Sequence, residues 1–370
     1  MSTTFNPSLH GLRGIAAFSV FLFHWDSFFP AAGKALPVYP IQGVEWSLAM
    51  LISFGWLGVP LFFVLSGYLL GGQLKQQSMS AGRLMHFWKR RALRIYPAVW
   101  VQLPILLVAA SFIPGITSTY PQGADLLRNI LLWINMPPWM TSPMNGVWWT
   151  LPIELSFYLF LPLLVLIQRK IGWVATYLGC VLCAFTWRWG IIALNDADFY
   201  VPYLGWLDML PGSISSFAAG FAITFIDFKW SKRQWLAATL GTIAVFLLLL
   251  HVLLVHIDVY WSGHWLLVVW NSCISLTIAG IIYCAIHPQA TGRWLGTAPL
   301  VWLGEISFGL YLWHLPVLLA LLKLTELANT ATGSFLALLI GLTLTLPLSA
   351  ASYYWIERPI MGWGKRKATL

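Results

Sequence analysis

The sequence predicts an all-α fold, a polytopic integral membrane bundle of about ten transmembrane helices with both termini in the cytoplasm. Of its 370 residues, 59% are hydrophobic and 9% are charged, whereas soluble domains carry about 25% charged residues. Long apolar runs recur from one end of the chain to the other, and the short alternating segments of membrane β-barrels are absent. These observations predict an integral membrane protein.

Ten runs match the roughly 20 residues that a helix needs to cross a bilayer. In order, they are 11–30, 47–70, 95–113, 148–167, 172–193, 208–226, 235–255, 265–286, 304–322 and 334–356. No small-residue cleavage site follows the first run, so it predicts a span and not a signal peptide. Between two spans, the segment ADLLRNILLWINM predicts a short interfacial helix. We expect one transmembrane domain over 1–370, with no appended soluble domain.

The loops between these runs are basic on one side only. All but four of the 21 Lys and Arg residues fall on this side, and the exceptions are Lys34, Arg128, Arg188 and Lys323. By the positive-inside rule, this side faces the cytoplasm. The formal net charge of +9 therefore reflects orientation and does not predict a nucleic acid partner. All four cysteines lie inside apolar runs, which favours packing over a disulfide or a metal site.

The first span, LHGLRGIAAFSVFLFHWD, contains Arg13 and His24. Roughly 16 Å of helix separates them, and the spacing returns nearly to the same face. Gly14 and Ala17 lie close to this face and leave room for a second helix or a ligand. One interpretation is a groove with a cation at its cytoplasmic mouth and a titratable imidazole, able to accept and return a proton, at mid-depth. The other is that Arg13 snorkels to the interface while His24 is a packed, hydrogen-bonded residue.

Four cations precede the third span in the segment FWKRRALRIYP, and they are Lys89, Arg90, Arg91 and Arg94. Paired guanidinium groups suit phosphates, because each can fork onto two oxygens. The cluster is therefore a candidate site for a phosphorylated ligand at the cytoplasmic mouth. The alternative is a cluster that sets orientation and touches lipid phosphates.

Two later spans also contain polar residues. Glu154, in VWWTLPIELSFYLFLP, requires a partner or a water-filled cavity. It pairs with His24 or a basic residue, holds a substrate hydroxyl, or makes a structural hydrogen bond. In LGEISFGLYLWHLP, the residues Ser307, Tyr311 and His314 follow helical spacing and can line one face. His314 reaches a depth similar to that of His24, although a lone buried histidine is also typical of packing.

Six stretches of the chain resemble, in order, the motifs of the acyltransferase-3 family of integral membrane acyltransferases. They are LHGLRGIAAFSVFLFH, GWLGVPLFFVLSGYLL, RRALRIYP, VWWTLPIELSFYLFLPLL, ISFGLYLWH and YWIERP. The resemblance covers essentially the whole chain. The family includes bacterial enzymes that O-acetylate lipopolysaccharide, peptidoglycan and exopolysaccharides.

The resemblance implies that His24 is the essential histidine and Arg13 the arginine of the same motif. It further implies that Arg91 and Arg94 form the arginine pair at the entrance for the acyl donor, typically cytoplasmic acetyl-CoA. The family often has Asp where this chain has His10. We therefore expect catalytic roles for His24, Arg13 and Glu154, and binding of acetyl-CoA by Arg91, Arg94, Arg90, Lys89, Tyr311 and His314.

The expected function is transfer of an acetyl group from acetyl-CoA to a hydroxyl of a cell-surface or lipid-linked glycan, in the bacterial cytoplasmic (inner) membrane. His24 would act as general base, with its imidazole oriented by Glu154 or Asp26. An acyl-histidine intermediate is the alternative route. Some relatives carry a periplasmic hydrolase-like domain, so either the membrane part transfers the group directly or a separate periplasmic protein completes the transfer.

Two other classes of function stay open from the residues alone. One is a proton-coupled transporter of a small solute or glycan precursor, and the other is a scaffold for glycan assembly without catalysis. Transporters of this kind usually show inverted repeats and paired broken helices, and no matched halves are visible in the sequence. The arginine cluster and the mid-depth histidine argue against a scaffold.

Overall fold

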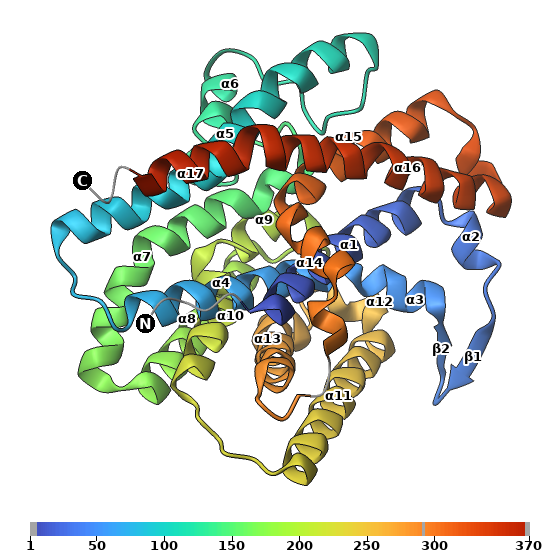
Figure 1. The fold of residues 1–370 in the computed structure, drawn as a ribbon. Helices are drawn as coiled ribbons and strands as arrows, with labels where there is room; N and C mark the ends of the chain where they lie inside the picture. Colours follow the sequence, from blue (N-terminus) through green and yellow to red (C-terminus); the bar gives the residue numbers. More distant parts are fainter. Residues whose placement is uncertain (1–5, 291–292, 367–370) are drawn as a thin grey trace.

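The computed structural model is a bundle of helices with one short hairpin, and it describes residues 6–290 and 293–366 (Figure 1). The α-helices are α1 (Pro7–Phe28), α2 (Ala31–Lys34), α3 (Leu48–Ser53), α4 (Gly58–Leu74), α5 (Ala81–Phe112), α6 (Gly123–Ile130), α7 (Thr150–Ile171), α8 (Trp173–Asn195), α9 (Leu204–Leu207), α10 (Leu210–Ala222), α11 (Lys232–Val255), α12 (Ile257–Tyr260), α13 (Trp265–Ile286), α14 (Ala298–Glu305), α15 (Ser307–Leu324), α16 (Ala331–Ala351) and α17 (Arg358–Arg366). The strands are β1 (Val38–Ile41) and β2 (Val44–Ser47), and a π-helical segment, η7 (Ser352–Glu357), joins α16 to α17.

Eight helical segments within the described residues are long and apolar enough to cross a membrane, which confirms an all-α, multi-pass membrane protein. The other two predicted spans, 11–30 and 208–226, coincide with α1 and α10. Helix α1 contains four ionisable residues, His10, Arg13, His24 and Asp26, and α10 is only 13 residues long. The segment predicted to form an interfacial helix contains most of α6.

Three boundaries differ from the prediction. The third span belongs to a longer helix, α5, which begins at Ala81 and not at residue 95, so the basic cluster lies within a helix. The ninth span is interrupted at Ile306, where α14 meets α15, and the tenth continues through η7 into α17. Hydropathy marks only the part of a helix that lies in hydrocarbon, and a helix can continue beyond it with a charged, solvated face.

Helix α1 lies within the bundle, in contact with α4, α14 and α15. Helix α14 lies directly against Gly14, where an added Cβ would come within 2.9 Å of the backbone nitrogen of Gly304. A second helix, and not a ligand, therefore occupies the open face that the small residues of α1 predicted. Gly67 of α4 and Gly220 of α10 make a similar close contact, because a Cβ at either would collide with a backbone carbonyl of the other helix.

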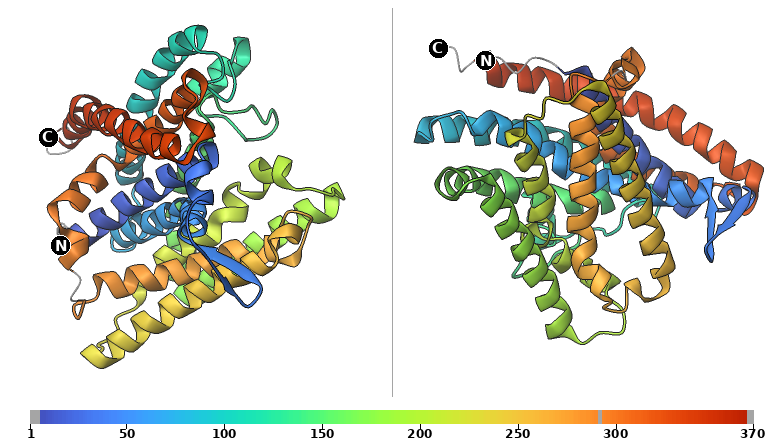
Figure 2. Two further views of the ribbon diagram at one scale, coloured as in Figure 1. Left: turned by 90° about the vertical axis from the view of Figure 1, so that its right-hand side faces the viewer. Right: turned by 90° about the horizontal axis from the view of Figure 1, so that it is seen from below.

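The hairpin lies at the end of the molecule opposite the end of α17 (Figure 1) and projects beyond the helices (Figure 2). Its strands pair antiparallel with Ile41 opposite Val44. Gln42 and Gly43 form the turn, and both have positive φ, 48° and 81°, as a primed two-residue turn requires. Because the hairpin closely follows α1 in the chain, it marks the end of the bundle toward which α1 runs.

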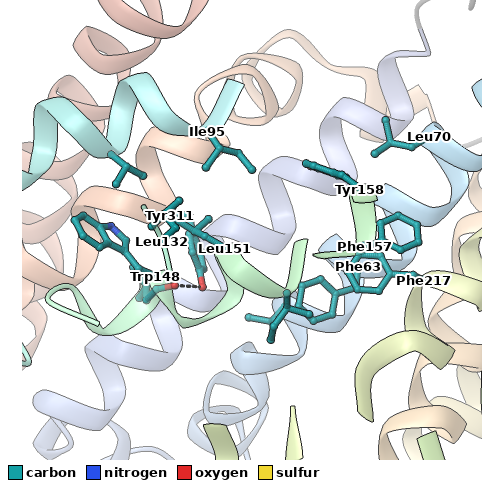
Figure 3. Close-up of a cluster of buried hydrophobic side chains, with 14 of the residues drawn as sticks. Phe63, Leu70, Ile95, Leu132, Trp148, Leu151, Phe157, Tyr158, Phe217 and Tyr311 are labelled. Atoms are coloured by element: carbon teal, nitrogen blue, oxygen red, sulfur yellow. Dashed lines mark hydrogen bonds between the residues drawn. The ribbon is translucent and has the colours of Figure 1, made fainter. Parts of the chain in front are cut away.

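A cluster of buried apolar side chains connects α4, α7, α10 and α15 (Figure 3). At one end of the cluster, the ring of Phe217 stacks on Phe63 and Phe157, with centroids 4.5 Å and 4.0 Å apart. Trp148 and Tyr311 lie toward the other end. Close packing of large rings holds these side chains in place. Phe63 and Tyr311 also form part of the wall of the candidate site.

Candidate functional site

A cavity of about 460 Å³ lies among helices α1, α4, α5, α7 and α15, and we call it the arginine cavity. Arg13 of α1 and Arg90, Arg91 and Arg94 of α5 line it. Glu154 of α7 is the one carboxylate among its described lining residues. Four guanidinium groups against one carboxylate give the cavity an excess of positive charge, which attracts anions.

The arginines of α5 retain unused hydrogen-bond donors. Among the described residues, none pairs with Arg90, Arg91 or Arg94 through a hydrogen bond or an ion pair, and the buried Nε atoms of Arg90 and Arg91 are without partners. Arg13 donates through Nη2 to Ser307 Oγ at 3.3 Å. Because buried polar groups are normally paired, unpaired guanidinium donors at a cavity wall fit an anionic ligand such as a phosphate.

The other residues expected to bind this ligand are placed differently. Lys89 is exposed on α5 and is absent from the cavity lining. Tyr311 does line the cavity, and so does His10. His314 is fully buried within α15, lies against His24 and is absent from the cavity lining. Of the residues predicted to bind acetyl-CoA, Tyr311 and the three arginines therefore line the cavity, whereas Lys89 and His314 do not.

Glu154 has hydroxyl partners. Its Oε1 accepts hydrogen bonds from the Tyr158 hydroxyl and from Ser66 Oγ, the latter at 3.2 Å. No ion pair joins it to another described residue, and no hydrogen bond joins it to His24. Of the alternatives open from the sequence, a structural hydrogen bond is the one present, at a position where the carboxylate also faces the arginine cavity.

A second cavity, of about 650 Å³, adjoins the first, and we call it the histidine cavity. His24 and Asp26 of α1 line it, and Ser53 and Asn271 contribute further polar groups. Aromatic rings form much of the remaining wall, and they include Phe23, Phe54, Trp56, Trp149, Tyr260, Trp261 and Trp270. Apolar walls with a few placed polar groups are typical of small-molecule and cofactor sites.

The histidine cavity also contains an ion pair that the sequence did not predict, between the buried Arg188 and the partly exposed Asp208. Arg188 donates to the carbonyl oxygens of Gly212 and Leu267, each at 3.1 Å, as well as to the Asp208 carboxylate. The available signal was weak: a lone arginine in the apolar segment FTWRWG, and an acid in LDML. Spacing along the chain could not pair them, because they lie on α8 and after α9.

The two cavities share part of their walls, and the shared residues are Val59, Phe63 and Tyr311. The Tyr311 hydroxyl donates to the Val147 carbonyl at 2.7 Å and lies 2.9 Å from Thr150 Oγ1, which holds the ring in this wall. The groove that the sequence suggested along α1 is divided between two adjoining cavities. Arg13 lines one cavity and His24 lines the other, because α4 and α15 place side chains between them.

Among the described residues, two polar groups lie within hydrogen-bond distance of the His24 imidazole, and neither is a carboxylate. Its Nδ1 lies 3.0 Å from the Val20 carbonyl oxygen and 3.1 Å from Nε2 of His314. Within the described residues, neither Glu154 nor Asp26 makes a hydrogen bond to it. The carboxylates expected to orient His24 therefore do not do so in this structure, and a histidine of α15 takes that position.

Comparison with known proteins shows that the chain is similar in sequence to several acetyltransferases. The chain is 25% identical over 395 residues to the peptidoglycan O-acetyltransferase OatA of Listeria monocytogenes, covering 97% of this chain and 56% of OatA. It is 24% identical over 387 residues to YrhL of Bacillus subtilis, provisionally assigned the same activity, covering 97% and 55% of the two chains. A provisionally assigned acetyltransferase of Acidianus two-tailed virus is 26% identical over 320 residues, which cover 85% of this chain and 84% of the viral protein.

The chain thus spans little more than half the length of the first two relatives. No solved structure matches it significantly. The sequence profile of one protein family, described as an acyltransferase domain, matches residues 6–354. Because the match covers nearly all of the chain, the protein belongs to the acyltransferase-3 family.

Proposed function

We propose that this protein is a membrane-embedded O-acyltransferase that moves an acetyl group from cytoplasmic acetyl-CoA to a hydroxyl of a cell-surface or lipid-linked glycan. The observation that carries the proposal is the wall of Val59, Phe63 and Tyr311 shared by the arginine and histidine cavities. A transfer between two substrates requires a site for each and a common boundary at which the reacting atoms meet.

The arginine cavity suits the acyl donor, acetyl-CoA. CoA carries a pyrophosphate and a 3′-phosphate, and guanidinium groups bind such oxygens through two parallel hydrogen bonds. Arg90, Arg91 and Arg94, whose guanidinium groups pair with no other described residue, would hold these phosphates. Arg13 would orient the pantetheine arm or the thioester oxygen from the same cavity.

The histidine cavity suits a sugar. Its aromatic walls can pack on the apolar faces of a sugar ring, while Asp26 and Asn271 can accept from or donate to ring hydroxyls. Relatives named for O-acetylation of peptidoglycan make this polymer the first acceptor to test. Because those relatives are longer, a further domain or a separate periplasmic protein would complete the transfer where direct transfer does not occur.

In the proposed reaction, Nε2 of His24 removes the proton of the acceptor hydroxyl as its oxygen attacks the thioester carbonyl. When the tetrahedral intermediate collapses, the carbon–sulfur bond breaks, and the leaving CoA sulfur takes this proton from the imidazolium. The products are an acetyl ester and free CoA, and the base is regenerated. A general base contributes typically about 10²–10⁴-fold, so positioning of the two substrates must supply much of the remaining acceleration.

The test is acetyl transfer by bacterial membranes that contain the full chain. Membranes receive radiolabelled acetyl-CoA from the cytoplasmic side and peptidoglycan as acceptor. We expect alkali-labile label on the glycan, reduced at least about 100-fold in His24→Ala. His86→Ala is the matched control, since His86 is absent from the linings of both cavities. Immunoblots establish equal insertion of each variant.

Two results would contradict the proposal. Normal transfer by His24→Ala would exclude His24 as the base. Membranes that label no glycan but accumulate a solute in a proton-dependent manner would favour the transporter.

A further inference from the structure

The side chains of His24 and His314 form a pair that connects α1 to α15. Nδ1 of His24 lies 3.1 Å from Nε2 of His314, and the ring centroids are 5.0 Å apart. His24 lines the histidine cavity, whereas His314 is fully buried behind it, between the rings of Phe21 and Tyr311. The outer imidazole can therefore reach a ligand, and the inner one can reach only its protein neighbours.

Backbone carbonyls determine which nitrogen of each ring carries the proton. Nδ1 of His314 lies 2.9 Å from the Leu310 carbonyl oxygen, which can only accept, so this Nδ1 carries a hydrogen. A neutral imidazole then has its lone pair on Nε2. That lone pair accepts from Nδ1 of His24, which must therefore carry a hydrogen, shared with the Val20 carbonyl 3.0 Å away. The lone pair of His24 is consequently on Nε2.

We propose that His314 is a positioning residue for His24. It holds the imidazole of His24 in the Nδ1–H tautomer, with Nε2 left to take the acceptor's proton. When Nε2 of His24 takes that proton, the lone pair of His314 still accepts from Nδ1–H and stabilises the imidazolium. This inference rests on the proposed function of His24 as general base.

A neutral imidazole suits this buried position better than a carboxylate. The position of His314 is fully buried, and a carboxylate without a compensating charge would be expensive to bury there. Among the described residues, neither Asp26 nor Glu154 makes a hydrogen bond to His24 or His314. The partner that orients a catalytic histidine is commonly an acid. Here Nε2 of His314 accepts the hydrogen bond from Nδ1 of His24, as a carboxylate would, but carries no charge.

The first test separates the acceptor function from packing. His314→Leu removes the acceptor while keeping an apolar side chain of similar size. In His314→Gln, the side-chain oxygen can accept in place of Nε2. Partners that orient metal-binding imidazoles contribute about 10- to 100-fold, and we expect His314→Leu to lower kcat by a similar factor, with KM for acetyl-CoA unchanged. His314→Gln should stay close to the wild type.

Two controls accompany these variants. His256→Leu should leave transfer unchanged, because His256 makes the same type of backbone contact, to Val252, at a site that lines neither cavity. The double variant His24→Ala with His314→Leu should be no slower than His24→Ala alone, since His314 acts through His24. Equal loss in the Gln and Leu variants, a change confined to KM, or a further loss in the double variant would overturn the inference.

The second test requires no activity. Solid-state ¹⁵N NMR of the histidine-labelled full chain in bilayers, with signals assigned from His24→Ala and His314→Leu, reports the proton on each nitrogen. We expect a protonated Nδ1 and an unprotonated Nε2 for His24, and the opposite tautomer would overturn the inference. If His24→Ala keeps normal transfer, the proposed function fails. If only His24→Ala is inactive and His314→Leu keeps the wild-type kcat, the role of His314 alone is wrong.

Discussion

Both cavities are lined by arginine, but the hydrogen-bond donors of the arginines are unpaired in one cavity and paired in the other. In the arginine cavity, Arg90, Arg91 and Arg94 keep donors that no described residue satisfies. In the histidine cavity, Arg188 is 3% exposed and its donors bond to two backbone carbonyls and to Asp208. A buried guanidinium with all of its groups paired holds helices together, whereas one with spare donors fits an anionic ligand. Pairing, and not residue type, separates the structural arginine from the binding arginines.

The largest expected effect comes from breaking the structural pair. Asp208→Asn keeps the size of the side chain and leaves the charge of Arg188 buried without its partner. Loss of one member of a fully buried ion pair costs about 3–5 kcal/mol. Because Asp208 is partly exposed, we expect the free energy of unfolding in detergent to fall by up to this amount. Thermal unfolding of the purified protein measures it. An unchanged unfolding temperature would show that Arg188 needs no counter-charge.

A smaller effect is expected from a binding arginine. Arg94→Ala removes a guanidinium from the arginine cavity without breaking a hydrogen bond or an ion pair to another described residue, so the unfolding temperature should change little. A hydrogen bond to a charged group contributes about 1.5–3 kcal/mol, which corresponds to a rise of about 10- to 100-fold in KM for acetyl-CoA. The variant should also respond less to ionic strength. Initial rates at several salt concentrations measure both, and a loss of stability with an unchanged KM would reverse our assignment of the two arginine states.

The wall between the cavities provides a third test. Tyr311→Phe keeps the ring in the wall but removes the hydroxyl that bonds to the Val147 carbonyl and Thr150. We expect a loss of about 1–2 kcal/mol in stability, because buried groups are left without a partner. KM should rise modestly for both acetyl-CoA and the glycan, since the wall is common to the two sites. A change for only one substrate would indicate that the wall belongs to a single cavity.

The smallest effect is expected at Lys89. Although it belongs to the same basic segment as Arg91 and Arg94, Lys89 is exposed and does not line the arginine cavity. Lys89→Ala should change stability by no more than about 0.5 kcal/mol, as surface substitutions usually do, and should leave KM for acetyl-CoA unaltered. A rise in KM equal to that of Arg94→Ala would place the phosphates outside the cavity.

Local patterns were sufficient to predict several parts of this protein. Hydropathy over about 20 residues predicts spans without knowledge of their neighbours, because the bilayer imposes the same length on each. The basic segment and the ionisable residues of α1 were recognisable because charge is rare and costly in such runs. The extension of α5 to Ala81 was missed, since its charged turns lie outside the hydropathy signal.

The sequence by itself determined the membrane class, the approximate spans and the residues able to carry charge or a proton. The tertiary structure alone decided which of these meet: His24 with His314, Arg188 with Asp208, and the two cavities at a common wall. Hydropathy and spacing are properties of one helix at a time. Contacts between α1 and α15, or between α8 and the segment after α9, depend on how helices cross and which small residues let them approach.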